Sequence, residues 1–201
     1  MEIQPFLERR QRLLASCEGA VAILPNAPTR YRNGGTEYPY RFDSDFWYLS
    51  AFPEPESVLV LDGRDAPSGG RSILFCRKKD EQRETWEGFR YGPEAARERF
   101  GFDEAHPIED FEPFFSELIG RSQKIAFPVG RDRDWDAKLF QAIQSAKGAA
   151  RKAIHPPEAI LDLCAWTHAM RRIKDAHEIA TMRAAAAIAD EIGRASCRER
   201  V

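Results

Sequence analysis

The apolar residues of the chain follow two spacings, and each spacing predicts a different kind of element. Four short apolar runs have the length of buried strands and end in proline, glycine or charged residues. They are 19–25, 57–62, 72–77 and 124–129. In three other stretches, apolar residues recur every three or four positions, which predicts amphipathic helices. These stretches are 2–16, 107–121 and 134–147.

The order of these elements indicates an α/β fold. The strands 57–62 and 72–77 flank a Gly/Pro/Ser-rich turn and are predicted to form a hairpin. Gly120 suits the end of the helix predicted over 107–121. In the helix predicted over 2–16, four charged residues stand between the apolar ones: Glu8, Arg9, Arg10 and Arg12. Strands separated by helices, with some antiparallel pairing, predict a mixed sheet covered by helices on both faces.

The pattern changes near 151–160. Two helical segments follow in succession, and Asp175 with Glu178 resembles a capping box at the start of the second one. This long helix has no packing partner left in the chain. We therefore expect a first domain, with its linker, over 1–172 and the start of a second domain over 173–190.

The last residues, 191–201, have a different character. Their sequence "EIGRASCRERV" can be back-translated into the adapter that is ligated to short-read sequencing libraries. We interpret this tail as a translated adapter, so that natural sequence stops near Asp190 and the chain is a fragment. A genuine polar C-terminus is the alternative.

Composition narrows the class of protein. With 43% hydrophobic and 31% charged residues, the 201-residue chain has the balance of a globular protein. Its net charge of −2, with no basic block, argues against a nucleic-acid partner. No apolar run approaches the length of a membrane span, and the N-terminus lacks the apolar stretch of a signal peptide. We expect a cytoplasmic protein with no membrane partner.

The residues that commonly carry chemistry form no convincing constellation. The four cysteines are scattered, which favours buried thiols over disulfides or a zinc site. The segment around His177 and Glu178 has Thr181 where a zinc protease would place its second histidine. Asp43 and Asp45 could hold a divalent cation through paired carboxylates. The stronger interpretation is that Asp43 or its neighbour Ser44 caps a short helix beginning near Phe46.

Two segments are rich in both aromatic and charged residues. The first, "TEYPYRFDSDFWYLSAF" over 36–52, has seven aromatic rings in seventeen positions. The second, "ETWEGFRYG" over 84–92, sets Trp86, Phe89 and Tyr91 among glutamates and an arginine. Rings that do not all fit inward, next to charges, predict a surface that a partner covers. Anchoring of one or two rings in a local core is the alternative.

Three stretches together resemble one family. "EYPYRFDSDFWYLSAFPEPESVLVL" and "ETWEGFRYG" are similar to segments of bacterial Xaa-Pro aminopeptidases, also called aminopeptidase P. "LDLCAWTHAMRRIKDAHEIATMRAAAAIAD" is similar to their interdomain region. The chain departs from the family pattern at Ser50-Ala51, where relatives have Thr-Gly, and at Gly35, where many have an acid. It also departs from the Trp-Arg of the family's interdomain segment, since Cys164 and Ala165 follow Leu163 here.

The resemblance implies a fold and an activity. The expected fold is an N-terminal α/β domain with a ribonuclease-H-like mixed β-sheet flanked by helices, of the creatinase/prolidase type, followed by the first helix of a truncated pita-bread domain. The family's two manganese ions lie in that catalytic domain, held by two Asp, one His and two Glu. No metal ligand or catalytic residue is therefore expected in this chain. The alternatives are an Xaa-Pro dipeptidase (prolidase) and a non-catalytic peptide- or protein-binding relative.

The resemblance also implies partners and two candidate substrate-binding residues. The intact enzyme would remove the N-terminal residue from peptides with proline in second position, and would form a homo-oligomer, a dimer or tetramer. Trp86 matches a family tryptophan that approaches the active-site mouth of a neighbouring subunit. Arg151 matches, by spacing, an arginine that lies shortly before the interdomain helices.

Overall fold

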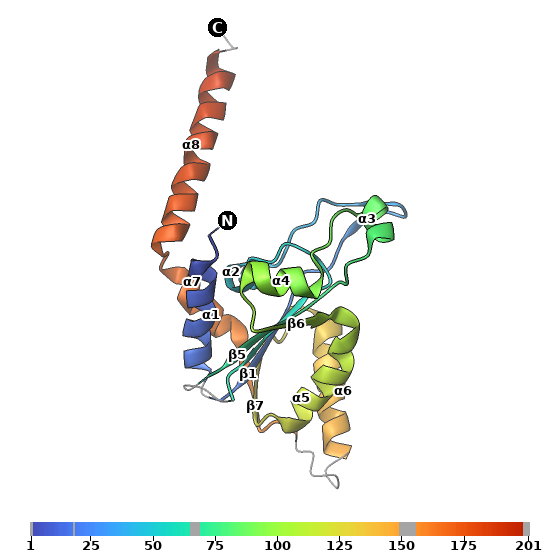
Figure 1. The fold of residues 1–201 in the computed structure, drawn as a ribbon. Coiled ribbons are helices and arrows are strands. Elements are labelled where there is room, and N and C mark those ends of the chain that lie inside the picture. Colours follow the sequence, from blue (N-terminus) through green and yellow to red (C-terminus); the bar gives the residue numbers. More distant parts are fainter. Residues whose placement is uncertain (1, 18, 65–68, 149–155, 199–201) are drawn as a thin grey trace. The chain divides into compact units, whose positions relative to one another are not determined.

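The chain divides into two compact units, Met1–Thr167 and His168–Val201 (Figure 1). The structure is a computed structural model, and it describes residues 2–17, 19–64, 69–148 and 156–198. The division falls within helix α7 (Leu163–Arg172), whereas our predicted boundary lies between 172 and 173. The domain limits stay a prediction from the sequence.

The first unit is built on a six-stranded mixed sheet in the order β6-β5-β4-β1-β7-β8. β1 pairs antiparallel with β4 and parallel with β7, and β4 pairs antiparallel with β5. Both outer pairs, β5 with β6 and β7 with β8, are parallel. The strands are β1 (Val21–Pro25), β4 (Val58–Asp62), β5 (Arg71–Cys76), β6 (Glu104–Pro107), β7 (Lys124–Phe127) and β8 (Ala159–Asp162). The predicted hairpin is thus confirmed as β4 and β5.

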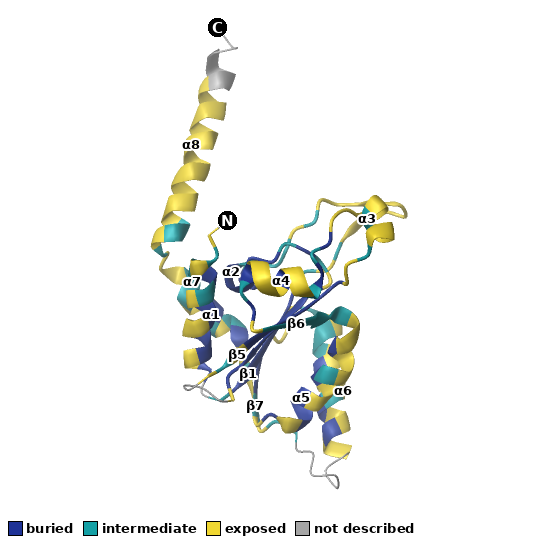
Figure 2. Cartoon of the chain, viewed as in Figure 1, coloured by how far each residue is buried: buried dark blue, intermediate teal, exposed yellow. Residues whose placement is uncertain are grey.

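Helices cover both faces of this sheet, as predicted (Figure 1). One face carries α5 (Phe111–Arg121), preceded by the short 3-10 helix η1 (Ile108–Asp110), and α6 (Arg133–Gly148). The core on this face includes Ile23 of β1, Phe75 of β5 and Leu139 of α6. The other face carries α1 (Gln4–Ser16), α2 (Ser44–Ser50) and α4 (Gly92–Phe100). Figure 2 shows buried positions concentrated on the sheet and on the helix sides that face it.

Three details differ from the pattern-based expectation. The helix predicted over 107–121 begins only at Phe111, because Pro107 ends β6 and Ile108–Asp110 form the 3-10 helix η1. β6, β8 and α4 were not predicted, since they are short and bury few apolar side chains. Arg9 and Arg10, which stand between apolar positions of α1, are both buried. Arg10 donates hydrogen bonds to the carbonyl oxygens of Leu49, Phe100 and Gly101, so this charged side chain joins three segments of one face.

The aromatic segment 36–52 contains helix α2 and the residues that lead into it. The Asp43 carboxylate accepts hydrogen bonds from the backbone N–H groups of Asp45 and Phe46, each at 2.9 Å, which confirms the cap. Arg131 donates to Asp43 and Asp45, with its closest contact 2.6 Å from the Asp45 carboxylate. These acids are therefore occupied by capping and by an arginine, which does not fit a cation site. Ala51 ends the helix with φ +55°, the left-handed conformation that the family's glycine adopts readily.

The second unit consists of the end of α7 and the long helix α8 (Ala176–Arg198). The predicted capping box is confirmed. The Asp175 carboxylate accepts from the Glu178 N–H at 2.8 Å, and the Glu178 carboxylate accepts from the Asp175 N–H at 3.1 Å. Helix α8 continues past residue 190 into the proposed adapter tail. None of the helices in the described part of the chain is both long and apolar enough to cross a bilayer.

Candidate functional site

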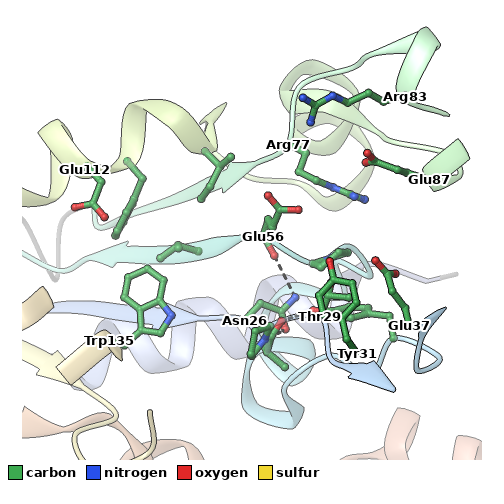
Figure 3. A pocket seen from close by; sticks show the side chains of 18 of the residues that line it. Asn26, Thr29, Tyr31, Glu37, Glu56, Arg77, Arg83, Glu87, Glu112 and Trp135 are labelled. Atoms are coloured by element: carbon green, nitrogen blue, oxygen red, sulfur yellow. Dashed lines mark hydrogen bonds between the residues drawn. The ribbon is translucent and has the colours of Figure 1, made fainter. Parts of the chain in front are cut away.

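The first unit contains an open groove of about 940 Å³ beside the end of β1 (Figure 3). It is lined by the loop after β1, the start of β4, the hairpin of β2 (Tyr31–Asn33) and β3 (Thr36–Glu37), α3 (Glu81–Glu87), and the first turns of α5 and α6. Segments far apart in the sequence therefore meet here. Trp86, the candidate that the resemblance indicated, is one of the lining residues.

Trp86 is carried by an exposed excursion of the chain that we call the tryptophan arm, residues 79–91. Asp80 starts its helix α3 by accepting hydrogen bonds from the N–H groups of Gln82 and Arg83, each at 3.1 Å. Gly88 ends the helix at φ +82°, a conformation that favours glycine. No residue of Glu81–Glu87 is buried, and the Trp86 side chain is 89% exposed. The arm thus presents an indole to its surroundings instead of anchoring it in a core.

Charged side chains join the two ends of the arm to each other and to its helix. Lys79 forms an ion pair with Glu84 at 2.7 Å and donates to the Arg90 carbonyl at 3.0 Å. The same Glu84 carboxylate accepts from the Arg90 N–H at 2.9 Å. The hydrogen bond from Lys79 is the main reason that the pKa of Glu84 lies below its usual value. Arg90 also pairs with Glu87.

The base of the groove is formed by buried polar groups. Asn26 follows β1 directly, and its side-chain amide donates to the Glu54 carbonyl at 2.9 Å and to the Ser57 hydroxyl at 3.1 Å. Its amide oxygen accepts from the backbone N–H of Asp43 at 2.9 Å, which ties this loop to the start of α2. Arg77 reaches the groove from the end of β5 (Figure 3). Its guanidinium lies 3.5 Å from the Glu54 carboxylate.

Acidic and aromatic groups surround the outer part of the groove. Tyr31 is exposed, and three nearby carboxylates, Glu37, Glu56 and Glu87, raise the pKa of its phenol, with Glu37 the largest cause. Tyr40 donates to the Ala27 carbonyl at 3.0 Å, and burial raises the pKa of its phenol. The groove therefore combines aromatic faces with charges of both signs, as surfaces that contact peptides commonly do.

The structure places one of the two predicted substrate-binding residues. Trp86 lies at the groove and is exposed, so it does not anchor a local core, whereas Tyr91 is partly buried and contacts Phe52 and Phe100. Arg151 lies outside the described residues. The buried polar residues Asn26 and Arg77, which line the groove, and Glu54, which contacts both, were not predicted. These residues come from three separate segments.

The fold and groove define an α/β domain that presents an aromatic arm. Residues 6–126 match the family described as aminopeptidase P, N-terminal domain. The Xaa-Pro aminopeptidase of Escherichia coli is 34% identical over 186 residues, which is 92% of this chain and 42% of that protein. A solved structure of an E. coli aminopeptidase P variant superposes with a TM-score of 0.86 at 33% identity, covering 91% of this chain and 42% of that one. A zinc-substituted E. coli aminopeptidase P in complex with product superposes with a TM-score of 0.85 at 33% identity, covering 90% and 41%.

These comparisons establish the family. The chain belongs to the aminopeptidase P family and matches its N-terminal domain. The mixed sheet with flanking helices, predicted from the sequence, is confirmed by the superposition. The chain spans about two fifths of the length of the relatives described here. The zinc-substituted structure shows that such relatives are metalloenzymes.

Proposed function

We propose that this chain acts as the N-terminal domain of an Xaa-Pro aminopeptidase, which removes the first residue from peptides with proline in second position. The observation that carries this proposal is the continuous similarity to the E. coli Xaa-Pro aminopeptidase over 92% of the chain. The TM-score of 0.86 adds that the two folds correspond over nearly the same length. Our prediction of a cytoplasmic location still rests on the sequence alone.

Two manganese ions would supply the chemistry, by activating a water that attacks the peptide bond before proline. The side chains of this domain do not fit such a centre. The resemblance places the ligands of these ions, two Asp, one His and two Glu, in the catalytic domain and not in this one. Its one carboxylate pair with sequence support, Asp43 and Asp45, is bridged by Arg131. We therefore derive no step through a metal in this domain.

The role proposed for this domain is to present Trp86 to a neighbouring subunit. A tryptophan that is 89% exposed leaves a large apolar surface in water, which a partner surface would remove. In a homo-oligomer the indole would cover the proline side of the neighbouring active site and exclude water there. Arg151, by its guanidinium, would hold a peptide carbonyl or carboxylate. Both roles need the complete enzyme.

The 201-residue chain alone should be inactive. Purified with manganese, it is expected to show no Xaa-Pro cleavage and no stoichiometric metal, because a catalytic metal needs several oriented ligands. The measurement is release of the N-terminal residue from an Xaa-Pro-Yaa peptide, together with metal analysis after gel filtration. Turnover above a metal-free control that survives a second purification would contradict this expectation.

The full-length protein tests the proposed reaction. With manganese it should cleave Xaa-Pro-Yaa tripeptides. A second substrate, an Xaa-Pro dipeptide, distinguishes an aminopeptidase from a prolidase. Cleavage confined to Xaa-Pro dipeptides would instead identify a prolidase. Metal-loaded protein that binds but never cleaves these peptides would identify a non-catalytic relative.

A further inference from the structure

Glu54 is a buried acid at the base of the tryptophan arm. It belongs to the loop between α2 and β4 and is only 5% exposed, although it lies outside the apolar core. One carboxylate oxygen accepts a hydrogen bond from the Tyr91 N–H at 2.6 Å. The other lies 3.5 Å from the Arg77 guanidinium. Tyr91 is the residue at which the arm returns to the body of the domain.

The contacts of Glu54 differ in kind from the contacts inside the arm. The hydrogen bonds of Asp80, the ion pair of Lys79 with Glu84 and the hydrogen bond from the Arg90 N–H to Glu84 all join residues within 79–91. They shape the arm but do not attach it to the sheet. The bond from the Tyr91 N–H to Glu54 spans 37 positions of sequence and reaches a loop fixed by Asn26. This bond holds the backbone of the returning end of the arm, while the Tyr91 ring packs against Phe52 and Phe100.

The charge of Glu54 matters as much as its hydrogen bond. The guanidinium groups of Arg77 and Arg90 both act on this carboxylate. Within the described chain, the Nε atoms of these two arginines are buried and have no hydrogen-bond partner. The positive charges of these two buried arginines are therefore balanced by nearby carboxylates, and among these carboxylates Glu54 is buried. Burial is the largest influence on the Glu54 carboxyl and raises its pKa, which these cations oppose.

We propose that Glu54 is the positioning residue of the tryptophan arm: it holds the returning end of the arm through the Tyr91 N–H and so sets the place of Trp86. This inference rests on the proposed function of Trp86 for its effect on catalysis. Its effect on the order of the arm is independent of that function. The two effects can be measured separately.

The first experiment measures amide hydrogen exchange in the 201-residue chain. In Glu54→Gln, the amide acceptor is uncharged and its NH₂ group faces the guanidinium of Arg77, so the hold on Tyr91 weakens. Exchange in the peptide 81–91 should rise by about tenfold or more, while β1 and β4 keep wild-type exchange. Glu98→Gln, the same change at an exposed position of α4, should alter neither region. Unchanged exchange in 81–91, or a rise spread equally over the sheet, would overturn the inference.

The second experiment is a double-mutant cycle in the full-length enzyme. Glu54→Gln should lower kcat/KM with metal content unchanged, and adding it to Trp86→Ala should cause no further loss. Additive losses would overturn the positioning role. Wild-type kinetics for Trp86→Ala would refute the proposed function of Trp86, while the exchange result would still decide the role of Glu54.

If Glu54→Gln does not fold, Glu54→Asp, which keeps the charge but draws it back from Tyr91, should increase the exchange of the same peptide. Wild-type exchange of 81–91 in Glu54→Asp would then overturn the proposal.

Discussion

Replacing Trp86 by alanine in the full-length enzyme should lower kcat/KM by roughly 1–3 kcal/mol of transition-state binding, which corresponds to about 5- to 150-fold. The indole is exposed at the end of an arm in which no residue of Glu81–Glu87 is buried, so its removal costs this domain little packing. Its contribution should come from covering the substrate in a neighbouring subunit. Steady-state kinetics with an Xaa-Pro-Yaa peptide, together with metal analysis, measure the effect.

Two variants serve as controls for this result. Trp86→Phe keeps an aromatic face and should retain part of the activity. Phe140→Ala removes an exposed ring from α6, outside the residues that line the groove, and should leave kcat/KM within about twofold. If Trp86→Ala shows wild-type kinetics with lowered thermal stability, Trp86 has only a local structural role.

Replacing Arg10 by methionine should lower the free energy of unfolding of the 201-residue chain by about 2–4 kcal/mol. Arg10 is 2% exposed, and its guanidinium donates to the carbonyl oxygens of Leu49, Phe100 and Gly101 at 3.1, 2.8 and 2.6 Å. It also lies over the Phe102 ring at 4.5 Å. Burial lowers its pKa to about 10, so the side chain is still charged at neutral pH. Methionine replaces the aliphatic stem but leaves these carbonyls without their donor.

The matched control for Arg10 is two positions further along the same helix. Arg12 is exposed and donates to the Tyr48 hydroxyl at 3.0 Å. Arg12→Met should therefore change the free energy of unfolding by less than about 0.5 kcal/mol. Urea denaturation followed by far-UV circular dichroism measures both variants. Equal losses from Arg10→Met and Arg12→Met would show that the buried hydrogen bonds of Arg10 contribute nothing particular to stability.

The interior strands could be predicted from the sequence because they are continuous apolar runs. β1 and β4 are buried at every position, and the one polar residue in them, Asp62, stands at the end of β4. The edge strands β6 and β8 were missed because neither buries a residue fully, and Glu104 and His106 make β6 look like a loop. Arg10 shows the converse difficulty. Its burial depends on carbonyls that lie 39 to 91 positions away, which periodicity does not reveal.

The candidate site was predictable only in part, for a similar reason. Trp86 stands in a local pattern of rings, glycines and charges that indicates an exposed surface. Glu54 and Arg77 have no such local signal, since their role arises when the loop before β4, the end of β5 and Tyr91 come together. One signal for Glu54 is that the family-like stretch beginning "EYPYR" extends past the aromatic segment and includes this residue. The likeness to the family extends through that glutamate.

The central claim is that this domain serves an enzyme that cleaves before proline. The most direct measurement compares the complete protein, loaded with manganese, on two matched peptides, Xaa-Pro-Yaa and Xaa-Ala-Yaa, by mass spectrometry of the released residue. The account predicts release from the proline peptide, a rate on the alanine peptide lower by about 100-fold or more, and no release by the 201-residue chain from either. Equal rates on both peptides, or no cleavage by the metal-loaded complete protein, would contradict it.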